Sequence, residues 1–166
     1  GNLGDSYLGL KALSNKVKFK NKDKLFFVDK YYKPELPLNL TKYLLKFANS
    51  SIDVSDGLID DLSKMINRQN LSFHLFENKI PVSNKLSNLI KKQRLNKINL
   101  ISNGDDYQVL FTADINKARI IQNASKTTGI KITKIGKIVS GKDRSLIFDE
   151  KGKQIRAKSK GYIHRF

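Results

Sequence analysis

Two aspartates three positions apart, with a serine between them, form the sharpest chemical pattern in the sequence. The segment Asp53-Val54-Ser55-Asp56-Gly57 leads directly into apolar residues at helical spacing. Mg²⁺ prefers hard oxygen ligands and commonly takes one or two carboxylates together with phosphate oxygens. The free N–H groups at a helix start can bind phosphate, and glycine permits close backbone approach. The segment therefore suits a site for magnesium and a phosphorylated ligand.

The same segment has a simpler structural explanation. Ser55 or Asp56 can cap the helix that follows, and Asp60 and Asp61 fall in its first turn, where negative charge is favourable. One aspartate can cap the helix while the other binds a metal ion. The residues alone therefore leave both interpretations open.

Two further segments carry candidate binding residues. Asn103-Gly104-Asp105-Asp106-Tyr107 precedes an alternating apolar stretch, so it can place a carboxylate at a strand edge facing a cleft. It can equally be an ordinary polar turn. Near the end of the chain, the ring of Tyr162 could stack on a heteroaromatic ligand or could dock the tail on the core.

The apolar periodicity predicts the elements that position these residues. An irregular interleaving of helices and strands indicates an α+β fold with a mixed, largely antiparallel sheet covered by helices. A lysine-rich surface loop is expected over 15–24. Helices are expected over 6–13, 58–67, 81–92 and 115–126, with another after Asn39 or Thr41 that ends at 49–51; strands are expected over 71–76, 107–112 and 130–138, and a hairpin over 145–157.

The composition excludes several classes of function. A length of 166 residues suits one domain, and the absence of Cys removes disulfides, thiol catalysis and Cys-ligated zinc. No apolar stretch is long enough to span a bilayer, so we expect no membrane and a cytoplasmic location. The formal charge of +17 comes from lysines spread along the chain, which favours a compositional origin over a nucleic-acid partner. A positive field also favours ATP and other phosphorylated substrates.

Taken in order, several segments resemble thiamine-monophosphate kinase, a family of the ATP-binding superfamily that includes aminoimidazole ribonucleotide synthetase. Residues 52–58 match its I/M-D-V-S-D-G-L signature, and residues 103–111 are similar to G-G-E-D-Y-E-L-L-F. Residues 1–10 resemble the opening G-x-L-G-D-S/A-x-x-G-L of the C-terminal domain, and residues 135–138 match I-G-x-I/V. The ending 161–166 resembles G-Y-x-H-F. The order of these motifs makes the resemblance specific.

The resemblance implies a fold like the C-terminal domain of aminoimidazole ribonucleotide synthetase, partly ferredoxin-like. It implies transfer of the ATP γ-phosphoryl group to thiamine monophosphate, giving thiamine diphosphate, with no covalent enzyme intermediate and so no catalytic nucleophile. By position, Asp53 and Asp56 would bind Mg²⁺ and Ser55 would contact ATP. Asp105 and Tyr162 would contact the thiamine substrate.

The resemblance also implies what this chain lacks. In the family an N-terminal domain supplies most ATP and magnesium ligands and the homodimer interface, and nothing in residues 1–166 corresponds to it. We therefore expect this chain to be the C-terminal domain and to have little or no activity alone. Asp105 stands where the family has Glu, which shortens the reach to substrate by one methylene.

Two alternatives remain. The first is another ATP-dependent enzyme of the same superfamily, of the selenophosphate synthetase or hydrogenase-maturation type. The second is a basic nucleic-acid-binding module without catalysis, which would gather its lysines and aromatic residues on one face.

Overall fold

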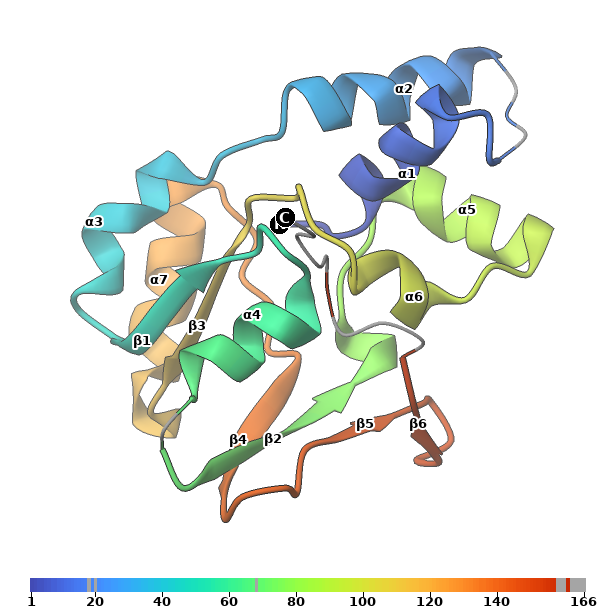
Figure 1. Cartoon of the computed structure of the whole chain (residues 1–166). Helices are drawn as coiled ribbons and strands as arrows, with labels where there is room; N and C mark the ends of the chain where they lie inside the picture. Colours follow the sequence, from blue (N-terminus) through green and yellow to red (C-terminus); the bar gives the residue numbers. More distant parts are fainter. Residues whose placement is uncertain (18, 20, 68, 158–160, 162–166) are drawn as a thin grey trace, which may run out of the picture.

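A computed structural model of the chain describes residues 1–17, 19, 21–67, 69–157 and 161 (Figure 1). Helices and strands interleave along the described chain, as expected for the α+β class. The helices are α1 (Asp5–Leu13), α2 (Asn21–Tyr32), α3 (Thr41–Leu44), α4 (Leu58–Met65), α5 (Asn84–Gln93), α6 (Lys97–Ile101) and α7 (Ala118–Thr128). The strands are β1 (Ala48–Asp53), β2 (Leu71–Phe76), β3 (Val109–Ala113), β4 (Gly136–Ser140), β5 (Leu146–Phe148) and β6 (Gln154–Ile155). Short 3₁₀ turns span Leu38–Leu40, Glu77–Lys79 and Ile115–Lys117.

The described strands form two separate sheets. β1 and β3 pair antiparallel, and the second sheet has the order β4-β2-β5-β6. In that second sheet β2 pairs antiparallel with β4 and parallel with β5, while β5 and β6 form an antiparallel hairpin. The predicted mixed and largely antiparallel pairing is confirmed, and it is divided between two sheets.

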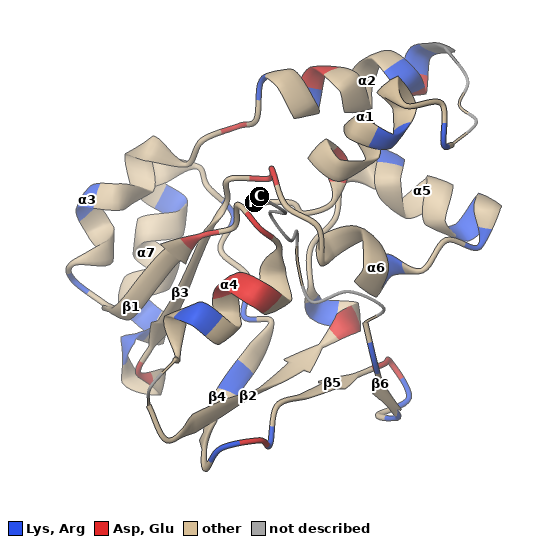
Figure 2. Ribbon diagram, in the orientation of Figure 1, with Lys and Arg blue, Asp and Glu red and all other residues tan. Residues whose placement is uncertain are grey.

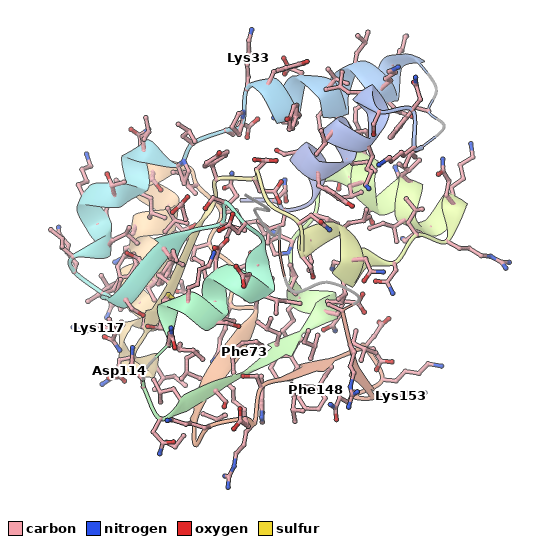
Figure 3. The ribbon with its side chains drawn as sticks, viewed as in Figure 1. Lys33, Phe73, Asp114, Lys117, Phe148 and Lys153 are labelled. Atoms are coloured by element: carbon pink, nitrogen blue, oxygen red, sulfur yellow. The ribbon has the colours of Figure 1, made fainter. Side chains whose placement is uncertain are left out.

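Helix α4 lies between the two sheets and carries the main core (Figure 1). Its apolar side chains recur at helical spacing and pack against β2, where Phe73 is 3% exposed and points toward the helix (Figure 3). Each fully buried large apolar side chain contributes about 1.5–3 kcal/mol relative to an exposed one. The buried members of this cluster are Leu3, Val54, Leu58, Ile59, Leu62, Ile66, Phe73, Leu75, Ile80, Ile98, Ile101 and Ile147.

Helices α1, α2 and α5 form a second layer beside the sheets (Figure 1). Their shared core contains Leu8 and Phe27, both completely buried. Gly9 lets α1 approach α2 closely, because a Cβ there would collide with the carbonyl group of Phe27. The predicted loop over 15–24 is therefore wrong from residue 21 onward. Lysines on the exposed face of α2 hide the helical spacing of its apolar residues.

Other boundaries also differ from the predictions. Residues 49–51 belong to β1 rather than to a helix end. The reason lies in a third core cluster, whose buried residues are Leu40, Phe47 and Ala124. Phe47 is buried between α3 and α7, so the chain turns back at this point and runs along β3. The strand expected over 130–138 begins only at Gly136. None of the helices in the described part of the chain combines the length and apolar character needed to cross a bilayer.

Candidate functional site

The two acidic segments meet where β1 ends and β3 begins. Asp53 is the register partner of Val109 at the last rung of this sheet. Backbone pairing continues beyond the strands, since the Val54 N–H donates to the Gln108 carbonyl at 2.8 Å. In Figure 2 the acidic segments of this region gather around the start of α4 and the loop before β3.

Asp105 lies directly beside Ser55. The Asp105 N–H donates to the Ser55 carbonyl at 2.9 Å, and the Tyr107 N–H donates to the Val54 carbonyl at 2.9 Å. Two segments separated by 50 residues (105 − 55) therefore run side by side. The backbone segments that carry Asp53, Ser55, Asp56 and Asp105 therefore lie side by side, whereas Tyr162 lies outside the described residues.

Glycines allow these two turns to approach through their backbones. A Cβ at Gly104 would collide with the Ser55 carbonyl oxygen, and a Cβ at Gly57 would collide with the Ser102 carbonyl oxygen. Gly57 also has φ of 126°, a conformation that side chains disfavour. The position of the Asp56 backbone therefore depends on both glycines.

Asp61 fixes the turn that carries Asp56. Its carboxylate is buried, and Oδ2 accepts hydrogen bonds from the N–H groups of Asp56 at 2.9 Å and Gly57 at 3.0 Å. The prediction that Ser55 or Asp56 caps the helix is wrong, because the N-cap is Gly57 and no side-chain cap bond forms there. Asp61 acts as the cap instead, because it accepts from the Asp56 and Gly57 N–H groups, which have no acceptor within the helix.

A lysine joins the carboxylates at the start of α4. Carboxylate oxygens of Asp56, Asp60 and Asp61 lie within 4.8 Å of one another, and we call these residues the acidic cluster. The Lys64 Nζ pairs with Asp56, with Asp60 at 2.7 Å and with Asp61 at 3.4 Å. The hydrogen bonds that Lys64 donates to Asp56 and then to Asp60 raise the pKa of Lys64, so it stays charged.

Gly161 places the start of the last segment against this cluster. A Cβ on Gly161 would lie 2.5 Å from the Asp60 Cβ and 3.1 Å from the Asp56 carbonyl oxygen. The residue that precedes Tyr162 therefore contacts the start of α4.

The loop before β3 holds Asp105 in an uncommon conformation. Asp105 has φ of 68° and Tyr107 has φ of 51°, both in the left-handed region. Burial raises the pKa of Asp105, and the nearby charge of Asp56 raises it further. Such backbone strain and charge proximity are typical of functional sites.

Asp106 ties the loop to the opening turn of the chain. Its buried carboxylate accepts hydrogen bonds from the Gly4 N–H at 2.7 Å and the Ser6 N–H at 3.3 Å. Burial raises the pKa of Asp106 to about 7 against these two backbone hydrogen bonds, which lower it. Asp105 is a predicted substrate-binding residue, whereas the sequence patterns assign no function to Asp106. The signal that could have identified Asp106 is the glycine turn at Gly4, whose helix start needs an acceptor.

A polar cavity of about 280 Å³ opens beside this turn. Asp5, buried next to it, accepts a hydrogen bond from the Ser83 Oγ at 2.7 Å. Burial raises the pKa of Asp5 to about 6. The residues lining the cavity are Gly1, Asn2, Asp5, Ser6, Phe26, Lys30, Pro34, Glu35, Ser83, Asp106 and Gln108.

The chemistry of the acidic residues fits a magnesium ion. Asp53 is exposed at the end of β1, and Asp56 is partly exposed in the turn before α4. Both are hard oxygen donors with access to solvent, and Mg²⁺ ordinarily keeps several waters or phosphate oxygens among its ligands. The existing pairing of Lys64 with Asp56 shows that this position attracts a cation.

The fold is that of the aminoimidazole ribonucleotide synthetase-like class. No protein-family model matches the chain. A solved structure of AaThiL complexed with AMPPCP and TMP superposes with a TM-score of 0.73 at 27% identity, covering 98% of this chain and 49% of that one. Escherichia coli HypE superposes with a TM-score of 0.71 at 14% identity, covering 99% of this chain and 49% of that one, which shows the fold alone.

The sequence comparison is more specific. The curated thiamine-monophosphate kinase of Buchnera aphidicola subsp. Acyrthosiphon pisum is 34% identical over 169 residues, covering 99% of this chain and 50% of that protein. This chain is a homologue of thiamine-monophosphate kinase and corresponds to its C-terminal half. The chain spans about half the length of these Buchnera relatives.

Proposed function

We propose that this chain supplies the C-terminal half of the site of a kinase that uses ATP to convert thiamine monophosphate to thiamine diphosphate. The observation that carries the proposal is the pairing of Asp105 with Ser55 at the end of β1, in a chain matched along 99% of its length by thiamine-monophosphate kinases. The relative solved with AMPPCP and TMP supports ATP and thiamine monophosphate as the two substrates.

The proposed roles follow from position and chemistry. Asp53 and Asp56 would hold Mg²⁺, which supplies charge neutralisation at the phosphate oxygens when it is bound. The Ser55 hydroxyl would donate to a phosphate oxygen of ATP. Asp105, and Tyr162 in the undescribed tail, would contact the thiamine substrate. In this chemistry the protein mainly positions the two phosphates, so rigid turns matter more than a nucleophile.

The rest of the site would come from an N-terminal half like that of the relatives, of which this chain spans about half the length. We propose that the full-length protein is a homodimer and acts in the cytoplasm. The chain without its other half should show little or no turnover, because most phosphate and metal ligands would be missing.

The test is formation of thiamine diphosphate by the full-length protein with ATP, Mg²⁺ and thiamine monophosphate. Asp56→Asn should lower kcat/KM by at least about 100-fold, because charge stabilisation of the transferring phosphate is lost. Asp143→Asn is the matched control, since Asp143 is exposed in the β4–β5 loop at φ of 58°, which Asn tolerates. Equal activity of the two variants would refute the proposed role of Asp56.

Acceptor choice separates this function from the superfamily alternative. The HypE likeness at 14% identity supports only a shared fold, so it does not favour that alternative. Full-length protein that turns over ATP with another acceptor, such as selenide, and not with thiamine monophosphate would overturn the proposal. Robust turnover by residues 1–166 alone would instead refute the need for a second half.

A further inference from the structure

We propose that Lys64 is an internal counter-cation that occupies the acidic cluster and is displaced from Asp56 when a divalent cation binds there. The inference rests on the proposed function, because it takes Asp56 as a metal ligand. It adds a residue to which neither the sequence motifs nor the relatives' names assign a role.

The contacts of Lys64 support this role. Its Nζ lies within ion-pair distance of all three carboxylates of the acidic cluster. Three carboxylates this close repel one another, so an ammonium group among them stabilises the start of α4. A divalent cation at Asp56 would satisfy the same carboxylate, so the lysine and the metal compete for one ligand.

The geometry also allows the Lys64 ammonium group to move away from Asp56. Its side chain is 46% exposed and carries a flexible four-carbon stem, so moving the ammonium group costs little burial. Asp60 is four residues before Lys64 on the same face of α4, at 2.7 Å. Lys64 can therefore keep Asp60 while releasing Asp56. Asp61 is held differently, because its Oδ2 is already used by the Asp56 and Gly57 N–H groups.

Competition of this kind makes a direct prediction about metal affinity. Removing the ammonium group should strengthen binding, because the metal no longer has to displace it. Exposed ion pairs contribute modestly, so the expected gain is roughly twofold to fivefold in affinity. A purely structural role for Lys64 would leave the affinity unchanged or weaken it.

The experiment measures Mn²⁺ binding to the full-length protein by the electron paramagnetic resonance signal of the free ion. Lys64→Met keeps the stem length and helix propensity while removing the charge. Lys33→Met removes the same net charge from an exposed side chain that projects away from the fold at the end of α2 (Figure 3). We expect Lys64→Met to bind Mn²⁺ roughly two to five times more tightly than wild type and Lys33→Met to match wild type. Asp56→Asn should weaken this binding, because it removes one carboxylate ligand.

A second measurement uses the wild-type chain, in case Lys64→Met does not fold. Nuclear magnetic resonance of the lysine Nζ groups should show the Lys64 signal moving during a Mg²⁺ titration while the Lys33 signal stays in place. A stationary Lys64 signal, together with metal-dependent changes at Asp56, would overturn the displacement and leave the metal role standing. Equal Mn²⁺ affinity in wild type and Lys64→Met would do the same. Absence of Asp56-dependent binding in every variant would overturn both.

Discussion

The Asp106 carboxylate holds the backbone of Gly4, a residue 102 positions earlier, through a hydrogen bond of 2.7 Å to its N–H group. A second bond from the Ser6 N–H makes this carboxylate the N-terminal acceptor of α1. Because Asp105 is its neighbour in the chain, the clamp also fixes the loop that carries the proposed substrate contact.

Replacing Asp106 should therefore loosen the fold at this point. In Asp106→Asn one amide oxygen remains to accept, while the amide NH₂ would face a backbone donor. We expect a loss of about 1–3 kcal/mol in the free energy of unfolding, measured by urea denaturation. Asp114→Asn is the control, because Asp114 is exposed before α7 and makes no cap bond (Figure 3). A loss of unfolding free energy no larger than that of the control would contradict the stabilising role of the Asp106 hydrogen bonds.

Stability should depend on pH through the same buried carboxylates. The folded-state pKa of Asp106 is about 7 and that of Asp5 about 6, both above the ordinary 3.8. Between these values the folded state keeps protons that the unfolded state has released. The contribution of these groups to stability is therefore greatest at low pH and is lost as pH rises from about 4 to 7, by at most about 1.4 kcal/mol per pH unit for each proton.

This dependence can be measured by urea denaturation at several pH values. Wild type should show a decline in stability across this window relative to Asp106→Asn, whose residue at 106 does not titrate. Parallel pH profiles for the two proteins would contradict the raised pKa of Asp106.

Gly104→Ala should damage the contact between the two acidic turns. The added Cβ would collide with the Ser55 carbonyl oxygen, so the backbone of one turn must move. We expect at least about 2 kcal/mol of destabilisation by thermal or urea unfolding. Gly152→Ala is the comparison, because φ of 77° makes it strained while no atom lies within 4 Å of its Cβ. The control should lose only about 1 kcal/mol. Similar losses at both positions would show that Gly104 is not required for close packing.

Asp61→Ala should cost more than Asp60→Ala, although the residues are adjacent in α4. Asp61 is buried and its removal leaves the Asp56 and Gly57 N–H groups without their acceptor, so we expect a loss of about 2–3 kcal/mol. Asp60 is partly exposed and pairs with Lys64, an interaction that contributes at most about 1 kcal/mol. Urea denaturation of both variants compares them directly, and an equal loss would contradict the assigned role of Asp61.

The sequence predicted the helices and strands whose apolar spacing is uninterrupted. The α4 helix and strand β2 follow their patterns closely, and α7 runs two residues past the expected end at 126 to Thr128, where Gly129 with φ of 69° ends it. Helix α2 was missed because its lysines dominate the composition of residues 21–24, while its burial depends on contact with α1. Local patterns do not contain such tertiary contacts.

The sequence predicted the exposed and partly exposed acidic residues of the candidate site. It did not predict the functions of the buried ones. The motif around Asp53 and Asp56 and the turn at Asp105 are visible locally, and the structure brings them together. Asp61 and Asp106 act through backbone N–H groups of other turns, so their roles depend on the fold. In the sequence Lys64 is an ordinary surface lysine. It becomes part of the site only because the course of α4 places its side chain next to Asp56.

The pairing of Asp53 with Val109 joins residues 56 positions apart (109 − 53). Closing a loop of that length costs entropy before any contact is gained, and such non-local pairings slow folding. During synthesis the segments that carry Asp53 and Asp105 cannot come together until Val109 has left the ribosome. A ligand that needs both segments can therefore stabilise the fold only after β3 has been synthesised.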